Sequence, residues 1–337
     1  MATNPLISRR GLFFGAAGVA AAGLLAACSD DKSGGTGSNT TSAKVGGGSF
    51  PAKVTHQFGT TTVEKAPASV VSLGWADADA LLALGVVPVG ILDWFQAWPV
   101  GVGPWAQAKL GGAKPTVLKG PEINYEQVAT LRPDLVTFTK SDNDKAKWDQ
   151  LEKLAPTLSG PAGVAAYGTT LKDQTMLIAE AIGKKAEGEA LVAANDKALA
   201  DVKAANPTFA GKSVVIAAAF SGQYGAYTRG DGRVQFMEAL GFKNSQKIED
   251  LKPQSFYAQI SKEQVNLLDA DLTVVFGLGA GDAIRKDAVL NGIGSAKAKR
   301  LLVIDDADLV NAFSTNSVLS TPYTIEKFLP MVKDALA

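Results

Sequence analysis

The chain has 337 residues, with 33 Lys and Arg against 33 Asp and Glu, and 46% of its residues are hydrophobic. At ~150 residues per domain, this length predicts about two domains. The even charge balance argues against a nucleic-acid-binding protein, which would carry a basic excess. A single cysteine, Cys28, and a single histidine, His56, exclude a disulfide framework and a metal site built from several such side chains. We therefore expect no resident metal or cofactor, and any metal that is handled should arrive inside another molecule.

The N-terminus has the pattern of an export signal. Arg9 and Arg10 precede the uncharged stretch 11–27, as a charged region precedes an apolar one in such signals. The segment Leu25-Ala-Ala-Cys28 resembles the lipobox of bacterial lipoproteins, in which cleavage precedes a cysteine that is then acylated. The paired arginines resemble a twin-arginine signal, with Leu12 in place of the usual phenylalanine. A permanent transmembrane anchor is the alternative, although 17 residues diluted by Ala and Gly are at the lower limit for a span.

Composition divides the chain into five segments. Residues 1–28 are assigned to the export signal with its lipobox, and residues 29–50, where Gly, Ser and Thr fill 14 of 22 positions, to a disordered tether. We then expect an N-terminal lobe over 51–183, an interlobe helix over 184–206 and a C-terminal lobe over 207–337.

Strands alternate with helices in both lobes. Apolar and β-branched runs predict strands at 70–73, 86–91, 134–138, 214–219, 272–276 and 301–304. Helical patterns lie at 77–85, 124–131, 234–240 and 322–336. This alternation predicts an α/β fold with mainly parallel sheets. Apolar residues at helical spacing over 184–206 predict one helix of roughly 30 Å that bridges the two lobes.

An internal repeat supports two related lobes. Glu126–Leu135 and Glu263–Leu272 are separated by 137 positions and share six of ten residues. Asn124 and Ser261 precede the two copies as N-caps, each followed by a glutamine three residues later, as in a capping box. Capping explains the glutamines and only part of the preference for Glu126 and Glu263, which also favour the positive end of the helix dipole.

Together these segments resemble one protein family. The order of the lipobox, the tether and five further segments is similar to that of the substrate-binding lipoproteins of iron-siderophore, haem and cobalamin ABC importers. The five segments are Ala68–Trp75, Leu84–Gly90, Asn124–Val128, Leu131–Leu135 and Ile260–Val265. The similarity extends from about residue 51 to the C-terminus, and none of its motifs is diagnostic alone.

The resemblance implies two Rossmann-like lobes with mainly parallel sheets, joined by a single long α-helix, with the ligand in the cleft between them. It also implies that surface glutamates, here Glu126 and Glu263, dock onto arginines of the membrane permease. Since one helix bridges the lobes, we expect their closure to be small.

Candidate ligand contacts in the N-terminal lobe follow the predicted strands. Ligands of open α/β sheets bind outside the carboxyl ends of the strands. Trp75 and Asp77 follow the first strand, and Trp94 and Trp98 follow the second. Four of the five tryptophans lie between positions 75 and 105, and indole rings offer a broad face to a flat chelate. Trp105 is equally well explained by packing.

In the C-terminal lobe, Tyr227 and Arg229 follow a predicted strand. The Arg229 guanidinium could bind carboxylate, hydroxamate or catecholate oxygens, although a solvated surface cation is the alternative. Arg233 lies on a predicted helix and is a weaker candidate. Phe276 and Phe313 lie near the ends of the last two strands, so both are expected to line the cleft.

No catalytic motif is present. The sequence lacks a Gly-x-Ser-x-Gly elbow, a phosphate-binding loop and a His-Glu-x-x-His motif. Asp77 with Asp93 or Glu122 could form the carboxylate pair of a glycoside hydrolase. Asp77 is equally explained as a residue that starts a helix. We therefore expect a binding protein and not an enzyme.

The sequence thus predicts an extracytoplasmic lipoprotein, attached to the bacterial cell membrane at Cys28, that binds a ferric siderophore and delivers it to an ABC importer permease. Alternatives are a haem or cobalamin receptor on the same scaffold, a free-metal receptor and an exported enzyme. The type of siderophore stays open, with a neutral or positive hydroxamate chelate favoured over an anionic catecholate because of the tryptophans.

Overall fold

The computed structural model describes residues 48–120, 122–220, 223–253, 256–277 and 279–337. All of these residues belong to one compact unit. The predicted export signal, the lipobox with Cys28, and the tether up to residue 47 lie outside the described residues. Within the described ranges, no helix combines the length and apolar character that a membrane span needs.

The folded body begins before Pro51. The ring of Phe50 packs with Val54 and Ile182 in a hydrophobic cluster and lies close to Gly183. Residues 48–50, which the composition assigned to the tether, therefore belong to the body. A β-hairpin follows, made of β1 (Ala52–His56) and β2 (Gly59–Val63).

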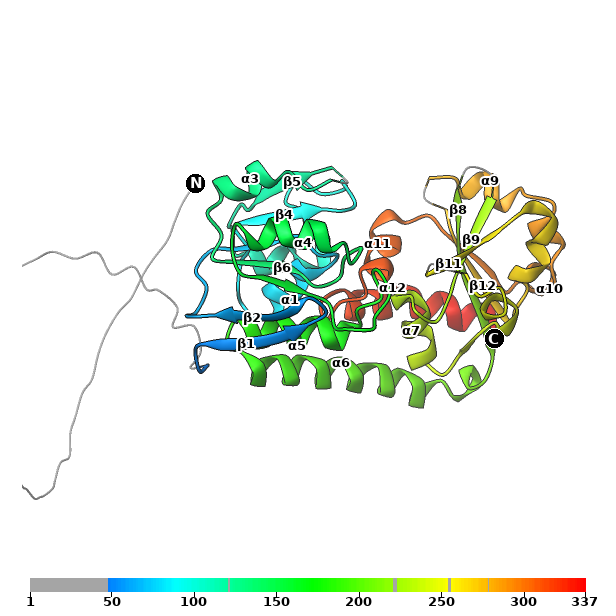
Figure 1. Cartoon of the computed structure of the whole chain (residues 1–337). Helices are drawn as coiled ribbons and strands as arrows, with labels where there is room; N and C mark the ends of the chain where they lie inside the picture. Colours follow the sequence, from blue (N-terminus) through cyan, green and yellow to red (C-terminus); the bar gives the residue numbers. More distant parts are fainter. Residues whose placement is uncertain (1–47, 121, 221–222, 254–255, 278) are drawn as a thin grey trace, which may run out of the picture. The chain divides into compact units, whose positions relative to one another are not determined.

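The N-terminal lobe is built on a parallel sheet (Figure 1). In the described residues it has five strands in the order β5-β4-β3-β6-β7, and every pair is parallel. They are β3 (Val70–Ser72), β4 (Gly90–Asp93), β5 (Thr116–Lys119), β6 (Leu135–Phe138) and β7 (Thr157–Ser159). The chain runs outward from β3 through β4 to β5, and then in the opposite direction from β6 to β7. The boundary between β3 and β6 is therefore the topological switch point, where a crevice forms at the carboxyl ends of the strands.

Helices cover the sheet of this lobe. They are α1 (Asp77–Ala83), α2 (Pro104–Gln107), η1 (Ala108–Leu110), α3 (Tyr125–Thr130), α4 (Lys145–Glu152) and α5 (Leu171–Ala181). Val70 packs with residues of α1 and α5, whereas Val71 packs with residues of α3 and α4. Successive residues of a strand point to opposite faces, so both faces of the sheet are buried, which explains the apolar runs.

The helix α6 (Lys185–Ala205) lies one residue inside each end of the predicted interlobe helix. It packs against α5 of the N-terminal lobe and against α7 and α12 of the C-terminal lobe (Figure 1). A Cβ at Gly188 would lie 2.5 Å from the Cβ of Ala179 in α5. This close approach explains why the interior of α6 contains a glycine.

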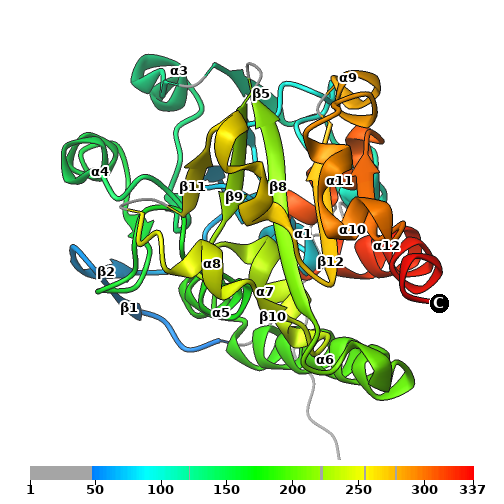
Figure 2. The ribbon, with the colours of Figure 1, turned by 90° about the vertical axis from the view of Figure 1, so that its right-hand side faces the viewer.

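The C-terminal sheet is mixed (Figure 2). Its described strands run in the order β11-β9-β8-β12-β13, and β10 pairs with β8. They are β8 (Ser213–Phe220), β9 (Gln223–Tyr227), β10 (Lys243–Asn244), β11 (Tyr257–Ile260), β12 (Leu272–Phe276) and β13 (Leu301–Ile304). β8, β10, β12 and β13 are parallel, whereas β9 is antiparallel to both of its neighbours, β8 and β11. The segment expected to be a loop after the first strand of this lobe is therefore partly β9.

The remaining helices belong to the C-terminal lobe. They are η2 (Pro207–Phe209), α7 (Gly232–Ala239), α8 (Gln246–Glu249), η3 (Lys262–Leu268), α9 (Gly281–Arg285), η4 (Leu290–Gly292), α10 (Gly294–Lys297), α11 (Ala307–Thr315) and α12 (Ser320–Leu336). In this lobe the ring of Phe313 contacts Phe236, Phe276 and Phe328, with ring centroids 5.0, 5.5 and 4.9 Å apart. The fold is the predicted one, an α/β protein with two sheets and a long helix that packs against both lobes.

Side chains of the N-terminal lobe bond directly to α11 and the residues that follow it. The indole Nε1 of Trp75 donates to the Ser314 carbonyl at 3.1 Å, and that of Trp98 donates to Asp308 Oδ1 at 3.0 Å. Asp79 of α1 accepts hydrogen bonds from Ser317 and from Trp105. Asp79 is 4% exposed, and this burial raises the pKa of its carboxyl to about 6.

We expect Phe328→Ala to destabilise the C-terminal lobe strongly. Phe328 is 1% exposed, and removing its ring leaves a cavity that the packed neighbours fill only in part. The free energy of unfolding in urea, followed by circular dichroism, should fall by about 3–5 kcal/mol. Val289→Ala is the control, because Val289 is 53% exposed. Equal losses in the two variants would contradict the assigned core.

We expect Asp79 to make stability depend on pH. Its pKa is raised from 3.8 to about 6 in the folded state, so the folded chain holds a proton that the unfolded chain releases. Protonated Asp79 therefore adds up to about 3 kcal/mol to the free energy of unfolding. This stabilisation is fully present below about pH 4 and is lost as the pH rises through about 6.

The measurement compares wild type with Asp79→Asn in urea unfolding at pH 4 and at pH 7.5. The wild type should lose stability relative to the variant over this interval. A difference between the two proteins that is the same at both pH values would contradict the raised pKa. Asp79→Asn retains every other titrating group, so the effect of those groups on stability cancels when the variant is compared with the wild type.

Candidate ligand-binding site

The site begins at the switch point of the N-terminal sheet. The loops that follow β3 and β6 lie side by side, and the backbone N–H of Trp75 donates to the carbonyl of Lys140 at 2.8 Å. Asp77 holds the same two loops together, because its carboxylate accepts from the backbone N–H of Thr139 at 2.9 Å. A Cβ at Gly74 would lie 2.4 Å from that carboxylate, so the close approach requires glycine.

Asp77 does not have the predicted role. Its side chain is 0% exposed and also accepts from Gln174 Nε2 at 2.6 Å. Burial raises the pKa of its carboxyl, and the hydrogen bonds from Thr139 and Gln174 oppose that rise. Asp77 is therefore fully buried and does not line the pocket, and its hydrogen bonds position the two loops.

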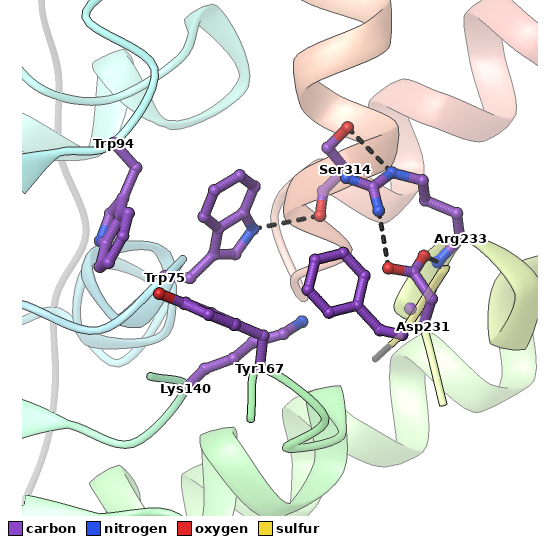
Figure 3. Close-up of a pocket in the computed structure, with 9 residues that line it drawn as sticks. Trp75, Trp94, Lys140, Tyr167, Asp231, Arg233 and Ser314 are labelled. Atoms are coloured by element: carbon purple, nitrogen blue, oxygen red, sulfur yellow. Dashed lines mark hydrogen bonds and ion pairs between the residues drawn. The ribbon is translucent and has the colours of Figure 1, made fainter. Parts of the chain in front are cut away.

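A pocket of about 150 Å³ lies above these loops, between residues of the two lobes (Figure 3). In the N-terminal lobe, the lining residues lie in loops that follow strands of the sheet. In the C-terminal lobe, they come from α7 and its N-cap, from α11 and from the segment before β11. The lining residues are Trp75, Trp94, Lys140, Tyr167, Asp231, Gly232, Arg233, Phe256 and Ser314.

One wall of the pocket is aromatic. Ring centroids lie 5.7 Å apart between Trp75 and Trp94, 5.9 Å between Trp94 and Tyr167, and 6.0 Å between Tyr167 and Phe256. Tyr167 has φ +59° and Ala76, next to Trp75, has φ +67°. Such left-handed backbone is costly for residues other than glycine and tends to cluster at functional sites. The wall is therefore held in place at a cost in local strain.

The opposite wall carries a fixed ion pair. Arg233 Nη1 lies 2.6 Å from Asp231 Oδ2, and its Nε donates to Ser314 Oγ at 3.1 Å. The guanidinium carbon is 4.0 Å from the centre of the Tyr227 ring, a cation–π contact. Asp231 also caps α7 by accepting from the backbone N–H of Arg233 at 2.8 Å. The guanidinium is thus held in one orientation.

Lys140 contributes a second cation. It follows β6, its side chain is 5% exposed, and it lines the pocket. Burial lowers the pKa of its ammonium group to about 8, against the opposing effect of Asp231. An aromatic wall with two cations is suited to a ligand that offers both apolar surface and anionic oxygens.

The structure brings Trp75 and Trp94 into this pocket, and their contact with a ligand remains a prediction. Trp98 lines an adjoining cavity of about 30 Å³, where its ring contacts Phe95 and Trp105. Tyr227 faces a neighbouring hollow of about 250 Å³ that is also lined by Arg233 and Phe256. Both therefore lie behind the pocket walls and not on them.

Three predicted residues are not placed in the pocket. The side chain of Arg229 is 50% exposed and pairs with Glu238 at 2.9 Å, as a surface cation does. Phe276 and Phe313 are each 1% exposed and lie in the core of the C-terminal lobe. The expectation that these three residues line the cleft is therefore wrong for this pocket.

The direction of β9 explains why the pocket lies away from the end of β12, where the sequence placed it. The pocket lies near the carboxyl end of β9 and the amino end of β11, and β9 runs antiparallel both to β8 and to β11. Residues after the parallel strand β12 therefore lie at the other end of the sheet. Phe313 lies within α11, where the sequence predicted a loop.

Sequence reasoning missed several lining residues. Lys140 follows the predicted strand 134–138, so the same rule that selected Trp75 could have found it. Arg233 was ranked below Arg229, although Asp231 two residues earlier marks a helix N-cap that would hold it. No sequence signal identified Tyr167 or Phe256.

The two glutamates of the repeat are both exposed. Glu126 lies in the first turn of α3, where Asn124 caps the helix by accepting from the Gln127 N–H at 3.0 Å. Glu263 lies in η3, a 3₁₀ helix and not the expected α-helix. No ion pair among the described side chains includes either glutamate. Their role in docking remains a prediction.

The chain is similar to known binding proteins. It is 29% identical over 220 residues to the Fe(3+)-citrate-binding protein YfmC of Bacillus subtilis, covering 64% of this chain and 65% of YfmC, just under two thirds of that relative. It is 30% identical over 268 residues to the probable siderophore-binding lipoprotein YfiY of the same organism, covering 77% of each chain. The structure of Streptococcus pneumoniae PiaA in complex with ferrichrome has 26% identity and a TM-score of 0.73, covering 85% of this chain and 98% of PiaA.

A family model also matches most of the folded body. The model describes a periplasmic binding protein and matches residues 70–307, from β3 to the start of α11. This range includes both sheets, the helix α6 and every lining residue of the pocket except Ser314. The chain belongs to the periplasmic binding protein family.

Proposed function

We propose that the pocket between the two lobes binds a ferric siderophore. The observation that carries this proposal is the combination of an aromatic wall from Trp75 to Phe256 with the cations Lys140 and Arg233. A ferric chelate offers flat or apolar ligand groups around an oxygen-rich centre, and this lining matches both features. The groups that line the pocket serve binding, and the ligand leaves chemically unchanged.

The relatives support a ferric chelate as the class of ligand. YfmC is named for ferric citrate, YfiY for a siderophore, and PiaA is seen with ferrichrome. Citrate binds iron through carboxylate oxygens and ferrichrome through hydroxamates. The family resemblance thus supports iron bound in a small organic chelate and leaves its chemistry to the residues of this pocket.

We further propose that the protein is an extracytoplasmic lipoprotein of an ABC importer. Acylation at Cys28 would attach the chain to the cell membrane. Glu126 and Glu263 are exposed on the two lobes and lie at corresponding positions of the internal repeat. Paired surface carboxylates of this kind can steer and orient docking on a cationic partner such as a permease.

Binding is tested by titrating the purified protein with a panel of ferric chelates, haem and cyanocobalamin while following tryptophan fluorescence. We expect a ferric chelate to quench the fluorescence, because Trp75 and Trp94 lie at the pocket. Trp94→Ala should weaken the affinity about tenfold, since aromatic contacts of this kind contribute about 1 kcal/mol or more.

Trp148→Phe is the matched control. Trp148 packs against His56 and Phe58 near the hairpin, and its Nε1 donates to the Thr157 carbonyl at 3.0 Å. This variant should bind normally. Binding of haem or cobalamin without binding of any ferric chelate would contradict the proposed function.

Delivery is tested by reversing the charge of both glutamates. We expect the double variant Glu126→Lys, Glu263→Lys to reduce cellular uptake of the iron chelate about tenfold or more, because like charges at a docking surface oppose association. The affinity for the chelate should stay unchanged, since neither residue lines the pocket. The control is Glu187→Lys, which reverses an exposed charge on α6. Normal uptake by the double variant would remove these residues from the docking surface.

A further inference from the structure

Lys140 is a buried cation without a partner among the described residues. Its side chain is 5% exposed, and within the described ranges no hydrogen bond or ion pair of its ammonium group is found. Buried lysines are rare unless they are paired, because removing an ammonium group from water is costly. Figure 3 shows Lys140 reaching into the pocket beside Tyr167, with its nitrogen directed toward the side where Asp231 and Arg233 lie.

The other charges that face Lys140 are already engaged. Asp231 pairs with Arg233 at 2.6 Å, so these two charges largely cancel. Asp77 lies below the loop and accepts hydrogen bonds from Thr139 and Gln174. Of the three charged neighbours that affect the Lys140 pKa, Asp77 has the smallest effect. The ammonium group of Lys140 therefore supplies the net charge of the pocket.

On the basis of the proposed function, we infer that the pocket selects anionic ferric chelates over neutral and cationic ones, and that Lys140 determines this selection by binding an anionic oxygen of the chelate. An ammonium–carboxylate hydrogen bond is among the stronger polar contacts, and it gives the ammonium group a partner that the described residues do not supply. A neutral or cationic chelate would displace water from the ammonium group without offering it an anionic oxygen, and so would bind more weakly. This inference differs from the sequence-based preference for a hydroxamate.

The pH dependence of binding follows from the same group. Burial lowers the pKa of Lys140 to about 8, so the ammonium form is present below that pH and is lost above it. The charged neighbours are Asp231, Arg233 and Asp77, and the pKa of the Tyr167 hydroxyl is raised further from neutrality by burial. Affinity for an anionic chelate should therefore be constant below about pH 8 and fall as the pH rises further.

The test measures dissociation constants of the purified full-length protein for three probes by fluorescence quenching. The probes are ferric citrate, which is anionic, ferrichrome, which is neutral, and ferrioxamine B, which is cationic. Each is measured with the wild type and with Lys140→Met, Lys140→Arg and Lys145→Met. Lys145 is the control because its side chain is 62% exposed and pairs with Asp149 at 2.7 Å. Equal thermal unfolding of the variants shows that each is folded.

We expect the wild type to bind ferric citrate at least about tenfold more tightly than the other two probes. Lys140→Met should lose about 10- to 100-fold of the affinity for ferric citrate only, and should lose the decline above pH 8. Lys140→Arg should retain most of the affinity, and Lys145→Met should behave as wild type.

Two results would overturn the inference and leave the proposed function intact. The first is a wild type that binds ferrichrome or ferrioxamine B as tightly as ferric citrate. The second is a Lys140→Met variant that keeps its affinity for ferric citrate or loses affinity equally for all three probes. Failure of every ferric chelate to bind would overturn the proposed function and this inference together.

Discussion

The hydrogen bond from the Trp75 N–H to the Lys140 carbonyl holds together the two loops from which the site is built. It forms because β3 and β6 are parallel neighbours, so that their carboxyl ends meet at one edge of the sheet, while the chain continues from them in opposite directions. Asp77 reinforces the junction from below at Thr139. Trp75 of the aromatic wall and Lys140, one of the two cations, are thus placed by one backbone contact, and a change in the register of β6 would displace both.

The sequence predicted the N-terminal half of the site better than the C-terminal half, for a topological reason. The rule that ligands lie at the carboxyl ends of strands assumes a parallel sheet, and the N-terminal sheet is parallel throughout its described strands. Trp75 and Trp94, which this rule selected, line the pocket, and their contact with a ligand stays a prediction. In the C-terminal lobe, β9 runs antiparallel to the preceding strand β8, and the rule selected Phe276, which lies in the core. The apolar pattern predicts where a strand lies, but the direction in which it pairs depends on the rest of the sheet.

Arg229 and Arg233 show a second limit of prediction from the sequence. Arg229 and Arg233 are four residues apart, and both are cations near aromatic residues in the sequence. What separates them is the partner that each meets in the fold. Glu238 holds Arg229 at the surface, whereas Asp231 and the ring of Tyr227 hold Arg233 toward the pocket. The sequence fixes which residues carry charge, and only packing decides which charge is buried.

Ser314 belongs to the last turn of α11, where carbonyl groups have no partner within the helix. Its carbonyl accepts from the indole of Trp75, and its hydroxyl accepts from Arg233. A neutral hydrogen bond of this kind is worth about 1 kcal/mol, because water can replace the donor when the bond opens. The bonds from Trp98 to Asp308 and from Ser317 to Asp79 join the same parts of the molecule. Loss of the Trp75 bond alone therefore leaves the N-terminal loops attached to α11 and the residues after it.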